Sequence, residues 1–187
     1  GYFDVVTAHK FGFRNSLASL GTALTEKQLR LIKSLTENII FIYDSDKAGI
    51  NAVLRAWEGI LKTELLGKVV VLPEGDDPDS YLNAKGTEGF NALINKSMDI
   101  GEYVIDRSVE GYNLATTSDR SQALTKALKV LEPVMNTLRL ADYANYLVSK
   151  LGIKEEFLYE AIKYDRKKDI TFVPLKEETK KVPFDSL

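Results

Sequence analysis

The chain lacks cysteine entirely and contains a single histidine, His9. Without cysteine it can form no disulfide, and one histidine cannot build a zinc site of the usual Cys/His kind. A metal ion bound by this chain would therefore be held by carboxylate oxygens. Such ligands favour magnesium or manganese.

Long hydrophobic runs and an excess of positive charge are also missing. No stretch approaches the roughly 20 apolar residues of a membrane span, and no secretory signal pattern opens the sequence. We therefore expect a cytoplasmic protein without a membrane partner. Its 25 basic and 27 acidic residues give a formal net charge of -2, which exerts no global attraction on nucleic acid. A polyanion would need a local basic patch, a metal site or a part of the protein outside this sequence.

The first part of the sequence alternates between predicted helices and strands. Thr25 and Gln28 have the spacing of a capping box, which marks the start of one helix. Continuous apolar runs such as "IIFIY" are typical of strands that are covered on both faces. The predicted helices are Asp4–Lys10, Thr25–Leu35 and 48–62, and the predicted strands are 15–19 ("NSLAS"), 39–43 ("IIFIY") and 68–72 ("KVVVL"). This alternation predicts an α/β fold, a Rossmann-like layer with a mostly parallel sheet.

Strand patterns stop after "PEGDDPDSY", and helical periodicity takes over. The predicted helices there are 87–96, 100–108, 118–130, 136–151 and 154–163. We therefore divide the chain into an α/β domain (1–97), an all-α helical subdomain (98–164) and a charged linker or tail (165–187).

Two acidic clusters follow neighbouring predicted strands. Asp44 and Asp46 come directly after the strand 39–43, and Asp77 and Asp79 lie in the turn after the strand 68–72. Parallel strands bring their carboxyl ends to one edge of the sheet, which is where open α/β sheets bind ligands. Carboxylates on such a frame can hold divalent cations that in turn bind phosphate oxygens. Together the clusters indicate a metal site.

Each aspartate also has an ordinary structural interpretation. An aspartate after a strand is often a helix cap, and "DDPD" has the composition of a turn in which Pro78 keeps Asp77 out of the helical conformation. For any one aspartate alone the structural interpretation is favoured. The argument for a metal site rests on the two clusters occurring together.

A small-residue loop, "SLGTALT", provides a third candidate region. Ser19, Gly21 and Thr22 could bring the backbone close to a phosphate or nucleotide, and Lys47 could neutralise phosphate charge. The residue types alone favour a tight strand-to-helix turn with capping hydroxyls, and an isolated lysine is usually solvated. We name these four residues as nucleotide- or template-proximal candidates.

Four stretches in this order, "GYFDVV", "ASLGTALT", "YDSDKAG" and "LPEGDDPDSY", resemble the TOPRIM domain of DnaG-type bacterial DNA primases. The resemblance covers about residues 1–95, and the helices that follow resemble the helical subdomain of the same polymerase core. Ser45 stands where the family usually has glycine, and Ser80 where it often has an acid. Both changes leave the matching aspartates in place.

The resemblance implies a role for each acidic position. Asp44 and Asp46 would be catalytic and would bind Mg²⁺ or Mn²⁺, while Asp77 and Asp79 would extend the metal site. In this family a glutamate immediately before the "GY" pair also belongs to the site. We therefore expect Gly1 to be a truncation point.

The implied function is synthesis of short RNA primers on single-stranded DNA from ribonucleoside triphosphates. The family's zinc-binding domain, basic amino-terminal half and carboxy-terminal helicase-binding domain are not in this sequence. Zinc and the contact with the replicative helicase are therefore expected in those parts, and this fragment alone is expected to be inactive. Two alternatives stay open: another TOPRIM phosphotransfer protein, such as a phage primase-helicase or a nuclease, and a non-catalytic α/β binding module.

Overall fold

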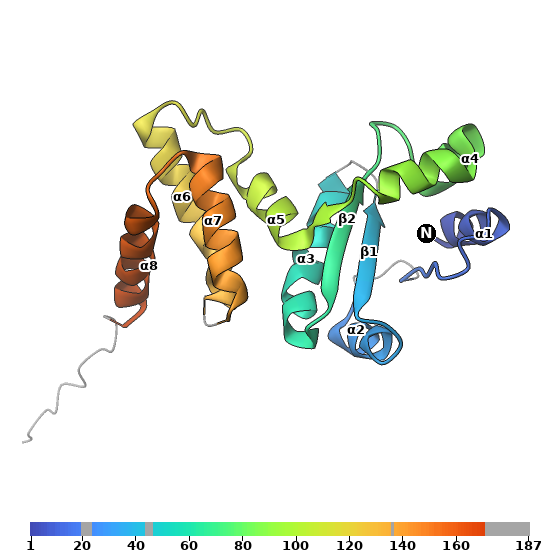
Figure 1. Cartoon of the computed structure of the whole chain (residues 1–187), viewed down its shortest axis with the longest axis horizontal. Helices are drawn as coiled ribbons and strands as arrows, with labels where there is room; N and C mark the ends of the chain where they lie inside the picture. Colours follow the sequence, from blue (N-terminus) through green and yellow to red (C-terminus); the bar gives the residue numbers. More distant parts are fainter. Residues whose placement is uncertain (20–23, 44–46, 136, 171–187) are drawn as a thin grey trace, which may run out of the picture.

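The computed structural model describes residues 1–19, 24–43, 47–135 and 137–170. Figure 1 shows a small sheet flanked by helices at one end of the molecule and a group of helices at the other. The predicted α/β fold followed by a helical part is confirmed. Within the described ranges, no helix combines the length and apolar character that a membrane crossing requires.

The sheet consists of β1 (Asn38–Tyr43), β2 (Leu66–Val71) and β3 (Met98–Asp99), in that spatial order. β1 and β2 are parallel, and the two-residue β3 runs antiparallel to β2. A parallel pair needs a crossover connection. That connection is α3 (Lys47–Thr63).

The other helices have the following bounds: α1 (Tyr2–Lys10), α2 (Glu26–Lys33), α4 (Pro78–Ile94), α5 (Ile100–Val109), α6 (Thr117–Leu131), the 3-10 helix η1 (Glu132–Val134), α7 (Arg139–Leu151) and α8 (Glu155–Ile170). α4 is kinked at Gly86, whose positive φ of 64° is a backbone conformation that glycine adopts without steric cost. The predicted helix from residue 87 is the second part of α4. The predicted capping box is also present, because Thr25 and Gln28 exchange hydrogen bonds at the start of α2.

Helices cover both faces of β1. Phe41 belongs to a large apolar cluster that includes α2, α3 and α5, whereas its neighbour Ile42 packs against a small cluster made by Ala8, Leu82 and Phe90. Successive residues of a strand face opposite sides, so α1 and α4 lie on the face away from α3. This is the layered arrangement that the apolar run 39–43 predicts.

The large cluster continues from the sheet into the helical part of the chain. Trp57 on α3 is almost fully buried, and its Nε1 donates a hydrogen bond to the carbonyl of Val130 at 3.0 Å. The same indole contacts Tyr143 of α7 edge to face, with ring centroids 5.5 Å apart. The α/β part and the helices α5–α7 therefore share core contacts, while the proposed domain boundaries stay a prediction.

One predicted element is wrong and one is too short. Residues 15–19, predicted as a strand, form an irregular segment in which Ser16 donates hydrogen bonds to the carbonyl of Phe13 from both its backbone and its hydroxyl. Such local side-chain bonds compete with strand pairing. At the other end α8 continues to Ile170, so residues 165–170 are helical, whereas the tail was predicted to begin at 165. Lysine and arginine in "DRKKDI" are good helix formers, which explains the extension.

Candidate metal site at the carboxyl edge of the sheet

The two acidic segments follow strands that end side by side in the sheet. Tyr43, the last residue of β1, pairs with Val71, the last residue of β2. The segment with Asp44 and Asp46 begins directly after Tyr43, and the turn that leads to α4 begins after Val71. The topology therefore starts both acidic segments from one edge of the sheet, as the sequence predicts.

Asp77 is the N-cap of α4. Its carboxylate accepts a hydrogen bond from the backbone N–H of Ser80 at 2.7 Å, and the Ser80 hydroxyl lies 3.0 Å from the backbone nitrogen of Asp77, which donates to it. Pro78 occupies the first turn, where its missing N–H costs nothing. The capping role considered for Asp77 is thus present, and among the described residues no donor bonds to its second carboxylate oxygen.

Capping makes the stability of α4 depend on pH. The hydrogen bond from the Ser80 backbone holds the pKa of Asp77 below its ordinary value of 3.8. The ionised Asp77 cap therefore stabilises the folded state fully at pH values above the pKa of Asp77 in the unfolded chain. This stabilisation is lost as the pH falls through the lower pKa of Asp77 in the folded state. Since asparagine caps equally well without titrating, Asp77→Asn is expected to lose less thermal stability than the natural sequence between about pH 6 and about pH 3. Thermal unfolding at the two pH values measures this, and equal losses in both proteins would contradict it.

Asp79 is held by α1, a contact that the sequence analysis missed. Its Oδ1 accepts a hydrogen bond from the hydroxyl of Thr7, and its backbone N–H donates to Oδ1 of Asp4 at 3.3 Å. Asp4 and Thr7 are three residues apart and lie on one face of α1. The spacing was visible in "GYFDVVTAHK", but no pattern in the sequence indicates that this face meets α4.

The other predicted site residues are less well defined. Asp44, Asp46, Gly21 and Thr22 lie outside the described residues. Ser19 ends the irregular segment before them, and Lys47 is the first residue of α3, with its side chain outside the description. Their roles in metal, nucleotide or template binding stay predictions.

The chemistry of the described donors fits a hard divalent cation, because Asp77 and Asp79 offer carboxylate oxygens. Within the described ranges, however, no group of three or more His, Cys, Asp or Glu side chains lies close enough to hold a metal ion. Asp77 and Asp79 alone do not make such a group, and the predicted ligands Asp44 and Asp46 lie outside the described residues.

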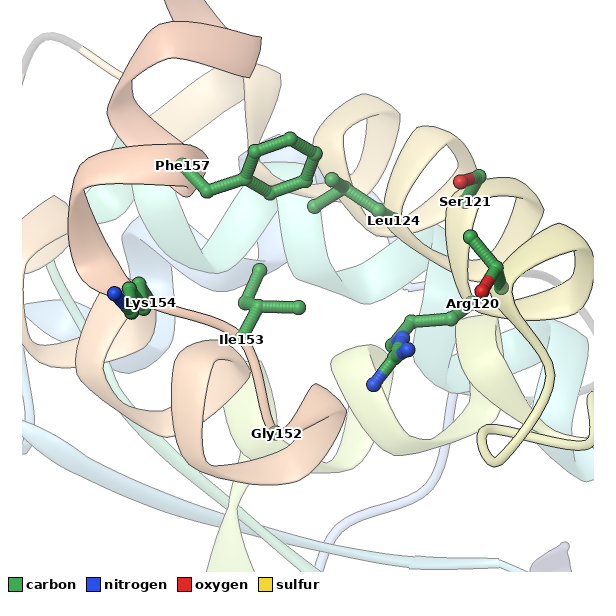
Figure 2. A pocket seen from close by; sticks show the side chains of 8 residues that line it. Arg120, Ser121, Leu124, Gly152, Ile153, Lys154 and Phe157 are labelled. Carbon is green, nitrogen blue, oxygen red and sulfur yellow. The ribbon is translucent and has the colours of Figure 1, made fainter.

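A separate pocket of about 380 Å³ lies far from the sheet, between the start of α6 and the turn from α7 to α8. Figure 2 shows the Phe157 ring beside Leu124, with Ile153 close to both. Phe157 is 56% exposed, although its neighbour Leu124 is buried. Arg120 and Lys154 line the same pocket, and neither forms an ion pair within the described part of the chain.

Comparisons with known proteins match both parts of the chain. Residues 1–82 match the family model for Toprim-like domains, and residues 102–156 match the model for the DnaB-helicase binding domain of primase. The second range contains seven of the eight residues that line the pocket in Figure 2.

Individual relatives are similar over most of this chain. A DNA primase of Clostridium acetobutylicum is 32% identical over 171 residues, which are 90% of this chain and 28% of that protein. The crystal structure of a DNA primase domain from Pseudomonas aeruginosa has a TM-score of 0.73 and 32% identity, covering 87% of this chain and 52% of the other. A DnaG primase catalytic domain bound to single-stranded DNA has a TM-score of 0.72 and 30% identity, covering 83% and 50% of the two chains. This chain thus spans less than a third of the curated relative and about half of the solved domains.

Proposed function

Because this chain is a homologue of the catalytic cores of DnaG-type bacterial DNA primases, we propose that it is the metal-binding part of an enzyme that synthesises short RNA primers on single-stranded DNA. The observation that carries the proposal is the sheet edge described above. Two acidic segments start from paired strand ends in a chain whose fold matches primase cores.

Asp44 and Asp46 would supply the main metal ligands, and Asp77 and Asp79 would add carboxylates from the start of α4. Bound Mg²⁺ or Mn²⁺ would neutralise triphosphate charge and favour attack of a primer 3′ hydroxyl on the α-phosphate, with loss of pyrophosphate. The protein itself would contribute by positioning the metal ligands. The capped start of α4 holds the carboxylates of Asp77 and Asp79 in place, and the parallel strands start both acidic segments from one edge of the sheet. Such a reaction needs no side-chain nucleophile.

Template binding requires positive charge that this chain does not supply by its overall composition, since its formal net charge is -2. One homologue is a primase domain bound to single-stranded DNA, which supports DNA as the template here. We propose that basic regions of the intact protein make most of the phosphate contacts, while the sheet edge positions the ribonucleotide.

Primer synthesis by the intact protein tests this function. The assay supplies unprimed single-stranded DNA, ribonucleoside triphosphates and Mg²⁺ or Mn²⁺, and short RNA products that require both template and metal are expected. Hydrolysis of DNA without nucleotide incorporation would instead identify a nuclease. Absence of any nucleotide chemistry would favour a binding module.

We also propose that the helices of this chain contact the replicative helicase. The match to the DnaB-helicase binding domain of primase over residues 102–156 supports a contact within this chain, besides the one expected from a domain outside it. The pocket at the α6 start offers an exposed aromatic side chain and two cations that form no ion pair among the described residues, features suited to an apolar anchor with an acidic neighbour.

Substitution at this pocket should weaken helicase binding. Arg120→Glu combined with Phe157→Ser is expected to lower the affinity of the intact protein for the replicative helicase about tenfold, because a charge contact and an aromatic anchor are both removed. Biolayer interferometry measures the affinity. Lys129→Glu, an exposed charge reversal later on α6, is the control. Equal affinity in the double variant and the control would contradict a helicase contact at this pocket.

A further inference from the structure

The start of α4 is fastened to α1 by hydrogen bonds that converge on Asp79. The Thr7 hydroxyl donates to Asp79 Oδ1 across 72 positions of sequence. Asn83 Nδ2, one turn further along α4, lies 3.3 Å from the same oxygen and 2.9 Å from the Asp79 carbonyl. Oδ1 of Asp79 therefore has two donors.

The other carboxylate oxygen of Asp79, Oδ2, differs from Oδ1 in its hydrogen bonds. Within the described ranges, no donor bonds to Asp79 Oδ2. Fixing one oxygen of a carboxylate restricts rotation about its terminal torsion, which is otherwise broad. A restricted carboxylate loses less conformational freedom when its free oxygen binds a cation.

Thr7 lies next to the buried contact between α1 and α4. The next residue, Ala8, is buried in a small apolar cluster with Leu82 and Phe90 of α4. Figure 1 shows α1 and α4 on the side of the sheet away from the helical part. The packing of these two helices places the Thr7 hydroxyl at the first turn of α4, so the hydrogen bond crosses a helix–helix contact with a buried apolar centre.

We propose that Thr7 is a positioning residue of the metal site: its hydroxyl fixes Oδ1 of Asp79 so that Oδ2 is presented to a divalent cation. This inference rests on the proposed function, because it requires Asp79 to be a metal ligand. Hydrogen-bonding partners of metal ligands commonly change metal affinity by about 10- to 100-fold when they are removed.

Thr7→Val tests the role because it keeps the shape of the side chain and removes only the hydroxyl. In the intact protein we expect this variant to bind Mn²⁺ about tenfold more weakly, as measured by the electron paramagnetic resonance signal of free Mn²⁺. Thr7→Ser restores a hydroxyl and is expected to bind Mn²⁺ nearly as tightly as the natural sequence. Asp79→Asn, which removes the proposed ligand, is expected to lose at least as much affinity as Thr7→Val.

A second threonine provides a matched control. The Thr87 hydroxyl also links the two helices, by donating to the carbonyl of Phe11 at 3.2 Å in a part of α4 remote from its first turn. Thr87→Val should lower thermal stability without metal about as much as Thr7→Val does, and leave Mn²⁺ affinity unchanged. Equal loss of Mn²⁺ affinity in both variants would show that Thr7 acts only through packing and overturn the proposal.

The remaining outcomes separate this proposal from the one on which it rests. Unchanged Mn²⁺ affinity in Thr7→Val, with weakened binding in Asp79→Asn, overturns the role of Thr7 and leaves Asp79 as a ligand. Unchanged affinity in Asp79→Asn removes Asp79 from the metal site, and the role of Thr7 falls with it.

Discussion

Replacing Asp44 and Asp46 together by asparagine is expected to reduce primer synthesis by the intact protein about 100-fold or more. Loss of a residue that merely orients a metal ligand already costs about 10- to 100-fold, and here two proposed ligands lose their charge. The measurement is the rate of ribonucleotide incorporation on single-stranded DNA at saturating template. A rate within a few-fold of the natural sequence would contradict a catalytic role for the pair.

The same variant distinguishes a metal site from structural caps. Like charges that are crowded at a ligand site repel one another, so their removal should leave the stability of the metal-free fold unchanged or raise it. A capping aspartate behaves differently, as Asp77 illustrates, because its loss removes a hydrogen bond. Glu58→Gln, which replaces an exposed acid in the middle of α3, is the control for charge removal away from a helix terminus. A clear fall in the unfolding temperature of the Asp44/Asp46 variant without metal would favour capping.

Gly101→Ala is expected to be the most destabilising small substitution in the helical part. A Cβ atom at Gly101 would lie 2.3 Å from both Cε1 and Cζ of Tyr143, far inside van der Waals contact. Neither the Gly101 backbone nor the Tyr143 ring can shift easily. The Gly101 backbone N–H donates to the N-cap residue Asp99 at 2.7 Å, and the ring of Tyr143 packs against Trp57. Overpacking of this kind costs about 3 kcal/mol, which lowers the unfolding temperature by roughly 6 to 12 °C in a protein of this size.

Thermal unfolding of three variants identifies the cause. Gly152→Ala has open space for a Cβ and only a left-handed backbone (φ 61°) to oppose it, so it should cost about 1 kcal/mol. Tyr143→Leu removes the ring that causes the clash, and Gly101→Ala should then add little further loss in the double variant. Additive losses from the two substitutions would show that the clash with Tyr143 is not the reason.

Local patterns in the sequence predict most of the fold. The capping box of Thr25 and Gln28 marks the start of α2, and the apolar run 39–43 is β1 with helices on both of its faces. Tyr143 lies within the predicted helix 136–151 and is buried against Trp57. These features depend on near neighbours in sequence and on periodicity, so a single sequence contains them.

Features that depend on distant contacts could not be predicted. The hydroxyl of Thr7 reaches Asp79 only because α1 packs on α4, and Gly101 must be glycine only because Tyr143 of α7 crosses it. The predicted strand 15–19 fails for a local reason, because Ser16 donates hydrogen bonds to the carbonyl of Phe13 three residues earlier. Long-range geometry decides the contacts of Thr7 and Gly101.

The central claim is that a divalent cation binds where both acidic segments leave the sheet, and cleavage directed by a bound metal ion tests it most directly. Fe²⁺ is added to the intact protein in place of Mg²⁺, hydroxyl radicals are generated with ascorbate and peroxide, and the broken peptide bonds are mapped by mass spectrometry. We predict cleavage near residues 44–46 and 77–79, suppressed by excess Mg²⁺ and absent in the Asp44→Asn/Asp46→Asn variant. Cleavage that is spread over the surface, or that persists unchanged in the variant, would contradict the assignment.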